Sequence, residues 1–162
     1  MQQHLLSLSH PRSLLWVTLF SVFLFGTLPA AATATECSIT VQTDDALRFI
    51  PSHITVPATC KDFTVTLTHT GHLPPLAMSH NWVLTKKSDL DGVARTGMLA
   101  GADVHHVDQN DKRVIAHTKL IGMGETTAVT FAVAQLKVGE PYVFLCTFAG
   151  HSPIMRGTLS VQ

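Results

Sequence analysis

A cysteine, a histidine and a methionine follow one another near the C-terminus, in the stretch LCTFAGHSPIMRG. They are Cys146, His151 and Met155, and their spacing is C-x4-H-x3-M. A thiolate and a thioether are soft ligands and an imidazole is intermediate, so the three together suit copper better than calcium or magnesium. Three residues in one turn are still an incomplete site, and a further ligand must come from elsewhere in the chain.

His80 is the candidate for that further ligand. It lies in PPLAMSHNWVL, where Pro74 and Pro75 fix the backbone that leads into a strand. A ligand at this place is positioned by strand geometry rather than by a mobile loop. Two histidines, one cysteine and one methionine are the ligand set of a trigonal copper site with a weak axial methionine.

The remaining histidines after residue 35 are more simply interpreted as strand-end or surface imidazoles. These are His53, His69, His72, His105, His106 and His117. The adjacent pair His105 and His106 is the most suggestive of a second metal site. Neighbouring residues of a strand point to opposite faces, however, so this pair would not easily share one ion.

The N-terminus has the organisation of a secretory signal peptide, which we assign to residues 1–34. Residues 14–28 are almost entirely apolar, and small residues at Ala32 and Ala34 form a cleavage motif. The apolar run is shorter than the roughly 20 residues that a membrane span requires. Cleavage after Ala34 would leave residues 35–162, a length typical of one domain.

The charges and cysteines after the signal peptide limit the possible functions. The formal net charge of the chain is zero and no run of Lys or Arg occurs, so nothing indicates nucleic-acid binding. The odd number of cysteines in an exported chain suggests one disulfide and one thiol with another role. The count alone does not identify the pair. We favour Cys37–Cys60, which flank two strand-like segments and leave Cys146 free.

The pattern of the mature chain is mostly that of short strands. DFTVTLTHT places Phe63, Val65 and Leu67 on one face and threonines on the other. About eight such segments, separated by turns, predict an all-β sandwich or barrel with antiparallel pairing.

Residues 86–113 interrupt this pattern of strands with apolar residues at helical spacing. They predict one short helix that begins near Asp89 and ends at Gly101, inside a long excursion between strands.

Three stretches, MSHNWVL, IAHTKLIG and CTFAGHSPIMRGTL, resemble the azurins, bacterial blue-copper proteins of the cupredoxin family. The resemblance runs from TEC to the last residue and implies a Greek-key, cupredoxin-like sandwich. It implies that His80, Cys146 and His151 are the equatorial copper ligands and Met155 the axial one. It also implies a weak contact from the backbone carbonyl of Ser79, a position at which azurins usually have glycine.

The resemblance assigns further roles around the ligands. It implies a Cys37–Cys60 disulfide, and backbone N–H donors from Asn81 and Phe148 near the Cys146 sulfur. The His151 ring edge would reach the surface and provide the electron exit. An apolar patch around it would dock redox partners; beside Phe148 it comprises Leu73, Met78, Met98, Ala149, Gly150 and Pro153.

The function implied is that of a periplasmic type 1 blue-copper protein that carries single electrons and is not an enzyme. Its partners would be redox proteins such as c-type cytochromes and periplasmic reductases, with no nucleic acid and no stable membrane association. A copper-buffering protein is one alternative, although such proteins favour exposed, exchangeable ligands. A copper reductase such as nitrite reductase is less favoured, because it needs a second copper site with further histidines.

Overall fold

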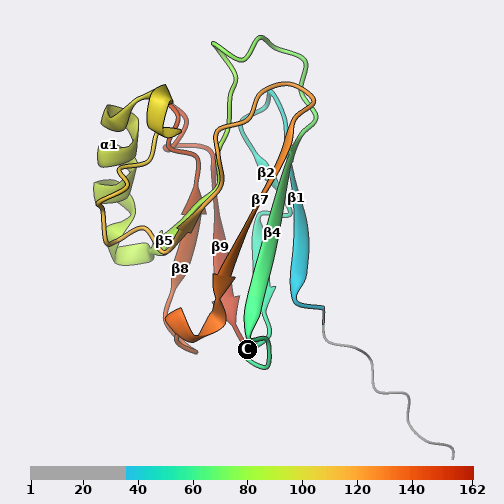
Figure 1. The fold of residues 1–162 in the computed structure, drawn as a ribbon, viewed down its shortest axis with the longest axis vertical. Helices are drawn as coiled ribbons and strands as arrows, with labels where there is room; N and C mark the ends of the chain where they lie inside the picture. Colours follow the sequence, from blue (N-terminus) through green and yellow to red (C-terminus); the bar gives the residue numbers. More distant parts are fainter. Residues whose placement is uncertain (1–35) are drawn as a thin grey trace, which may run out of the picture. The chain divides into compact units, whose positions relative to one another are not determined.

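The structure is a computed structural model that describes residues 36–162, which form a sandwich of two β-sheets (Figure 1). The signal peptide predicted for residues 1–34 lies outside the described residues. One sheet has the order β2 (Phe49–Ile50), β1 (Ser38–Thr43), β4 (Asp62–His69) and β7 (Thr126–Ala132). The other has the order β3 (His53–Val56), β9 (Arg156–Val161), β8 (Tyr142–Leu145), β5 (Val83–Lys86) and β6 (Ala116–His117). The predicted all-β, cupredoxin-like sandwich is therefore confirmed, with nine strands rather than about eight.

The alternation of β4 shows how the sequence forms a half-buried sheet. Phe63, Val65 and Leu67 are buried between the sheets, whereas the threonines between them face outward. The outward hydroxyls pair across the ladder with β7, as in the bond between Thr64 and Thr130 at 2.8 Å. Apolar burial on one face and cross-strand hydrogen bonds on the other fix the register of these two strands.

Two strand pairs differ from the antiparallel arrangement that the sequence predicts. β1 pairs with β4 in parallel, and β3 pairs with β9 in parallel. The cause lies at Pro51, which interrupts the segment from Phe49 to Val56. The residues before this proline join the first sheet as β2, and those after it join the second sheet as β3. The two halves of this segment therefore pair with different strands, β2 with β1 and β3 with β9.

The core between the sheets contains a cluster of aromatic rings packed among aliphatic side chains. Trp82 is fully buried and stacks on Phe131 of one sheet and Phe144 of the other, at ring-centroid distances of 6.3 and 5.5 Å. Phe49 contacts Phe144 edge-on at 5.3 Å. These rings bury large apolar areas on both sheets and hold the sheets in one relative position. Trp82 lies two residues after the predicted ligand His80, so the rigid core extends to the candidate site.

The excursion between β5 and β6 contains the predicted helix. α1 (Leu90–Ala100) is preceded by the 3-10 turn η1 (Lys87–Asp89) and followed by η2 (Ala102–Val104); a third turn, η3 (Val133–Gln135), precedes β8. Gly101 ends α1 with φ +84°, a value that glycine adopts without strain. Val93 of α1 packs on Val83, Val107 and Leu145 in a second, smaller core. Among the described residues, no helix is long and apolar enough to cross a membrane.

Candidate metal centre

Three predicted ligands converge at one end of the sandwich. The ligand atoms of His80, Cys146 and His151 all lie within 4.8 Å of one another, and all three residues are buried. The Cys146 Sγ lies 3.9 Å from His80 Nδ1 and 3.7 Å from His151 Nδ1. A sulfur and a nitrogen bound at the lengths typical of zinc, with 120° between them, would be about 3.8 Å apart. The donor set and its spacing therefore fit one trigonally bound ion of this size.

Backbone hydrogen bonds fix these ligands on rigid elements. His80 forms a two-way bridge with Ile121, with N–H to O distances of 2.8 and 2.9 Å. Cys146 directly follows β8, and its N–H donates to the carbonyl of Met155 at 3.0 Å. The N–H of Met155 in turn donates to the carbonyl of His151 at 2.8 Å. The three residues of C-x4-H-x3-M are therefore tied together by their own backbone.

The side chains of Asn81 and Thr147 connect the two ligand-bearing segments. The Asn81 amide donates to Thr147 Oγ1 at 2.8 Å, and the Thr147 N–H donates to Asn81 Oδ1 at 2.9 Å. Both residues are buried, and each follows a predicted ligand directly in the sequence. The role of the Asn81 backbone was predictable from the sequence, but that of Thr147 was not predicted. A polar residue directly after a candidate ligand, just beyond an otherwise apolar strand, was the available signal.

Burial sets the protonation of the predicted ligands. It raises the pKa of the Cys146 thiol to about 12, against the opposing effect of the backbone N–H groups of Asn81 and Phe148. Burial, together with repulsion from His69 and His151, lowers the pKa of His80 to about 4. Burial also lowers the pKa of His151. The metal-free site therefore holds a neutral thiol and neutral imidazoles, and a cation that displaces the thiol proton would bind a thiolate stabilised by two N–H groups.

His69 supports the site without joining the ligand cluster. Its ring stacks on His80 with a centroid distance of 4.7 Å and is almost fully buried. Its Nδ1 accepts a hydrogen bond from the N–H of Gly71 at 3.0 Å, so its Nε2 carries the proton and donates to the Met78 carbonyl at 2.9 Å. Both ring nitrogens are occupied, which leaves none free to bind a metal.

The two predicted axial contributors, Met155 and Ser79, lie on the chain beside the cluster. Met155 is fully buried and Ser79 is 5% exposed. The serine hydroxyl donates to the Pro75 carbonyl at 2.7 Å. Within residues 36–162, only Leu47, His105 and His106 are non-glycine residues with positive φ, so Ser79 keeps an ordinary backbone conformation without glycine's freedom. The axial roles of Met155 and of the Ser79 carbonyl stay predictions.

The remaining cysteines form the expected disulfide. Cys37 and Cys60 are joined, with their Cα atoms 5.7 Å apart. Cys146 is the free cysteine of the described chain. The choice between pairings that the cysteine count left open is thereby settled, and the thiol at the candidate site is available as a ligand.

The residues of the predicted apolar patch are mostly accessible. Leu73 and Met98 are 45% and 44% exposed, Ala149, Gly150 and Pro153 are exposed, and Met78 is half-buried. Two more exposed apolar side chains lie close in sequence to the ligands and were not predicted as part of the patch, Leu76 at 94% and Ile154 at 67%.

Comparison with known proteins agrees with this geometry. Residues 35–162 match the family described as copper binding proteins, plastocyanin/azurin family. The chain belongs to that family. It is 49% identical over 144 residues to an azurin of Pseudomonas aeruginosa, covering 89% of this chain and 97% of the relative. It is 51% identical over 127 residues to an azurin of Pseudomonas denitrificans, covering 78% and 99%. A solved azurin of the obligate methylotroph Methylomonas sp. strain J superposes with a TM-score of 0.76 at 45% identity, covering 79% of this chain and 99% of that one.

Family membership and the donor set together define the chemistry. The protein is a blue-copper electron-transfer protein that binds a single type 1 copper ion. A soft thiolate combined with two imidazoles is the donor set that such an ion prefers.

Proposed function

We propose that this protein carries single electrons in the periplasm between redox proteins such as c-type cytochromes and periplasmic reductases, and that it catalyses no reaction of its own. His80, Cys146 and His151 are the equatorial ligands, with Met155 and the Ser79 carbonyl as weak axial contacts. The spacing of the Cys146 sulfur and the two imidazole nitrogens, which fits one trigonally bound ion, is the observation that carries this proposal.

Bound copper supplies one-electron chemistry, because it alternates between Cu(II) and Cu(I). The contribution of the chain is to prevent movement when the charge changes. His80 is held by its bridge to Ile121, and the loop ligands are tied to one another by backbone hydrogen bonds. Ligands that are already in place need little rearrangement between the two oxidation states, which favours fast electron exchange.

Two features of the site argue against the two alternatives, the burial of its ligands and the number of ligand clusters. A copper-buffering protein must exchange its metal readily, whereas His80 and Cys146 are fully buried and are held by backbone hydrogen bonds to Ile121 and Met155. A copper reductase needs a second metal cluster. Within residues 36–162, His80, Cys146 and His151 form the one group of three or more His, Cys, Asp or Glu side chains close enough to hold an ion.

The organisation of the chain agrees with an exported protein. We propose that residues 1–34 are a cleaved signal peptide and that residues 35–162 are the mature copper domain. The Cys37–Cys60 disulfide supports this assignment, because disulfides form and persist in oxidising compartments such as the bacterial periplasm.

His151 is proposed as the electron exit. The residue is 6% exposed, so only a small part of it reaches the surface, and we propose that this part is the ring edge that a partner approaches. The apolar residues around it suit brief encounters, whose interfaces lie at the small end of the range for protein complexes. A partner that docks over Met98 and Pro153 would come close to the exit without forming a long-lived complex.

Rapid-mixing kinetics with a reduced c-type cytochrome test the proposed function. Met98→Glu places a charge in the apolar patch and is expected to slow electron transfer by more than any accompanying change in the reduction potential explains. Val138→Glu is the matched control. Val138 is 70% exposed and lies between η3 and β8, whereas the ligand loop follows β8 at its other end. Equal rates for wild type and Met98→Glu would contradict docking at this patch, and absence of any electron exchange by the wild type would contradict the proposed partner class.

A further inference from the structure

The loop after α1 holds two consecutive residues in the left-handed conformation. His105 has φ +58° and His106 has φ +54°. This conformation is sterically unfavourable for residues that carry a Cβ atom. Strain of this kind persists where surrounding contacts determine the backbone, and it is concentrated at functional sites.

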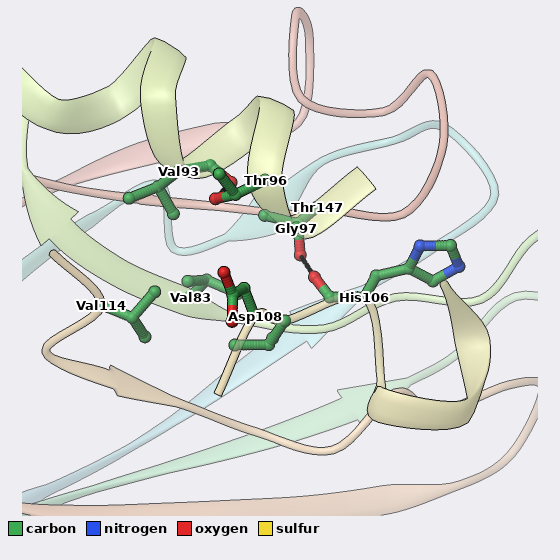
Figure 2. Close-up of a pocket in the computed structure, with 9 residues that line it drawn as sticks. Val83, Val93, Thr96, Gly97, His106, Asp108, Val114 and Thr147 are labelled. Carbon is green, nitrogen blue, oxygen red and sulfur yellow. Dashed lines mark hydrogen bonds between the residues drawn. The ribbon is translucent and has the colours of Figure 1, made fainter. Parts of the chain in front are cut away.

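Residues next to the copper ligands hold this strained backbone in place. The carbonyl of His105 accepts a hydrogen bond from the Asn81 amide at 2.7 Å. The carbonyl of His106 accepts one from Thr147 Oγ1 at 2.6 Å, shown as the dashed line in Figure 2. α1 packs closely against the same carbonyl group, because a Cβ atom at Gly97 would lie 2.6 Å from the His106 carbonyl oxygen. The loop and the two ligand-bearing segments therefore form one connected unit.

The two histidine side chains have different surroundings. The His106 imidazole points away from the valines under α1 (Figure 2), and the residue is 7% exposed. It meets the Phe148 ring edge-on at a centroid distance of 5.0 Å, and Phe148 in turn lies 4.7 Å from the His151 ring. His105 is partly exposed, and its ring has no hydrogen bond or ring contact with the described residues.

The His106 imidazole is also incompletely satisfied. Its Nδ1 is buried and has no hydrogen-bond partner among the described residues. A buried polar atom without a partner is destabilising, and an apolar ring of similar size would avoid that cost. The position therefore combines backbone strain, an unsatisfied nitrogen and contact with the ring that covers His151.

We propose that His106 is a positioning residue of the copper site. Its ring holds Phe148 in place, Phe148 holds the exit imidazole of His151, and the polarity of the His106 ring contributes to the reduction potential. The inference rests on the copper site proposed above.

The direction of the effect follows from charge. The oxidised site, Cu(II) with one thiolate, carries one more positive charge than the reduced site. A less polar neighbour disfavours the more highly charged oxidised state and raises the reduction potential, whereas water entering beside the site lowers it. His106→Phe should therefore raise the potential. His106→Asn, which tolerates the left-handed backbone but leaves space for water, should lower it.

The test compares these two variants with matched controls at the neighbouring residue, His105→Phe and His105→Asn, which experience nearly the same backbone angle. The reduction potential is measured at pH 8.5, well above the ordinary histidine pKa of about 6.5, so that imidazole charging does not contribute. NMR of the metal-free proteins supplies a copper-independent readout, the flipping rate of the Phe148 ring. We expect opposite shifts of potential in the two His106 variants, faster ring flipping in His106→Asn, and neither change in the controls.

The outcomes distinguish a failure of the copper site from a failure of the positioning role of His106. A wild-type protein that takes up copper without turning blue would refute the copper site itself. A blue wild type whose His106 variants keep its potential and ring-flip rate would overturn the positioning role alone. Equal shifts in all four variants would show that loop strain, not the His106 ring, is responsible. If His106→Asn does not fold, the potential of His106→Phe decides.

Discussion

The metal-free protein should lose stability as the pH falls from 7.5 to 5, and His80 should account for much of the loss. This residue is fully buried, and burial lowers its pKa to about 4. In the unfolded chain the pKa is about 6.5, so the unfolded state binds the proton more readily. The stabilising contribution is therefore complete above pH 6.5 and is lost as the pH falls toward 4.

The magnitude follows from the two pKa values. Their difference of about 2.5 corresponds to roughly 3 kcal/mol at 1.36 kcal/mol per pKa unit, of which about 2 kcal/mol is lost between pH 7.5 and 5. Urea unfolding of the metal-free protein across this range measures the loss directly. His80→Asn should flatten the profile, leaving a smaller slope from groups such as His151, whose pKa burial also lowers.

His117→Asn is the control for this experiment. His117 is half-buried and lies outside the ligand cluster. Its replacement shows whether a loss of slope is specific to His80 or follows the replacement of any histidine. A His80→Asn protein with the full wild-type slope would refute the reasoning, because the buried imidazole would then not be the group that resists protonation.

Two further predictions concern the scaffold. Replacing Cys37 and Cys60 together by Ala should lower the free energy of unfolding by about 3 kcal/mol, since the crosslink spans a sequence separation of 23; urea unfolding with no measurable loss would contradict this. Gly97→Ala should destabilise, because its Cβ would lie 2.6 Å from a backbone oxygen, and overpacking of about 1–3 kcal/mol exceeds the gain of about 1 kcal/mol in helix propensity. Gly92→Ala is its comparison: a Cβ atom there would meet the Arg113 side chain, which also binds Asp111, rather than backbone, so the loss in thermal unfolding should be smaller than for Gly97→Ala.

The ligand cluster was the most predictable part of the molecule. Cys146, His151 and Met155 lie within one turn, so their spacing in the sequence directly limits their spacing in the fold. His80 could be added because Pro74 and Pro75 fix the backbone before the predicted strand; in the fold His80 lies three residues before β5 and forms a bridge with Ile121. The strand β4 and the helix α1 were predictable for a related reason, because each depends on a local periodicity of apolar residues.

Features that depend on distant segments were not predictable. The parallel pairing of β1 with β4 depends on which sheet each half of the chain around Pro51 joins, and no local pattern records this. The link from Thr147 to the carbonyl of His106 joins residues 41 positions apart, across a loop whose left-handed backbone the sequence does not announce. His106 was interpreted as an ordinary imidazole because its burial comes entirely from tertiary packing.

The most direct test is a titration of the metal-free protein with Cu(II), followed by visible absorption. We predict an intense blue colour that saturates at one equivalent, bleaches on addition of ascorbate, and is absent in Cys146→Ser. A copper adduct of the wild type that stays colourless, or a blue colour that survives in Cys146→Ser, would contradict a type 1 copper site built on this thiolate.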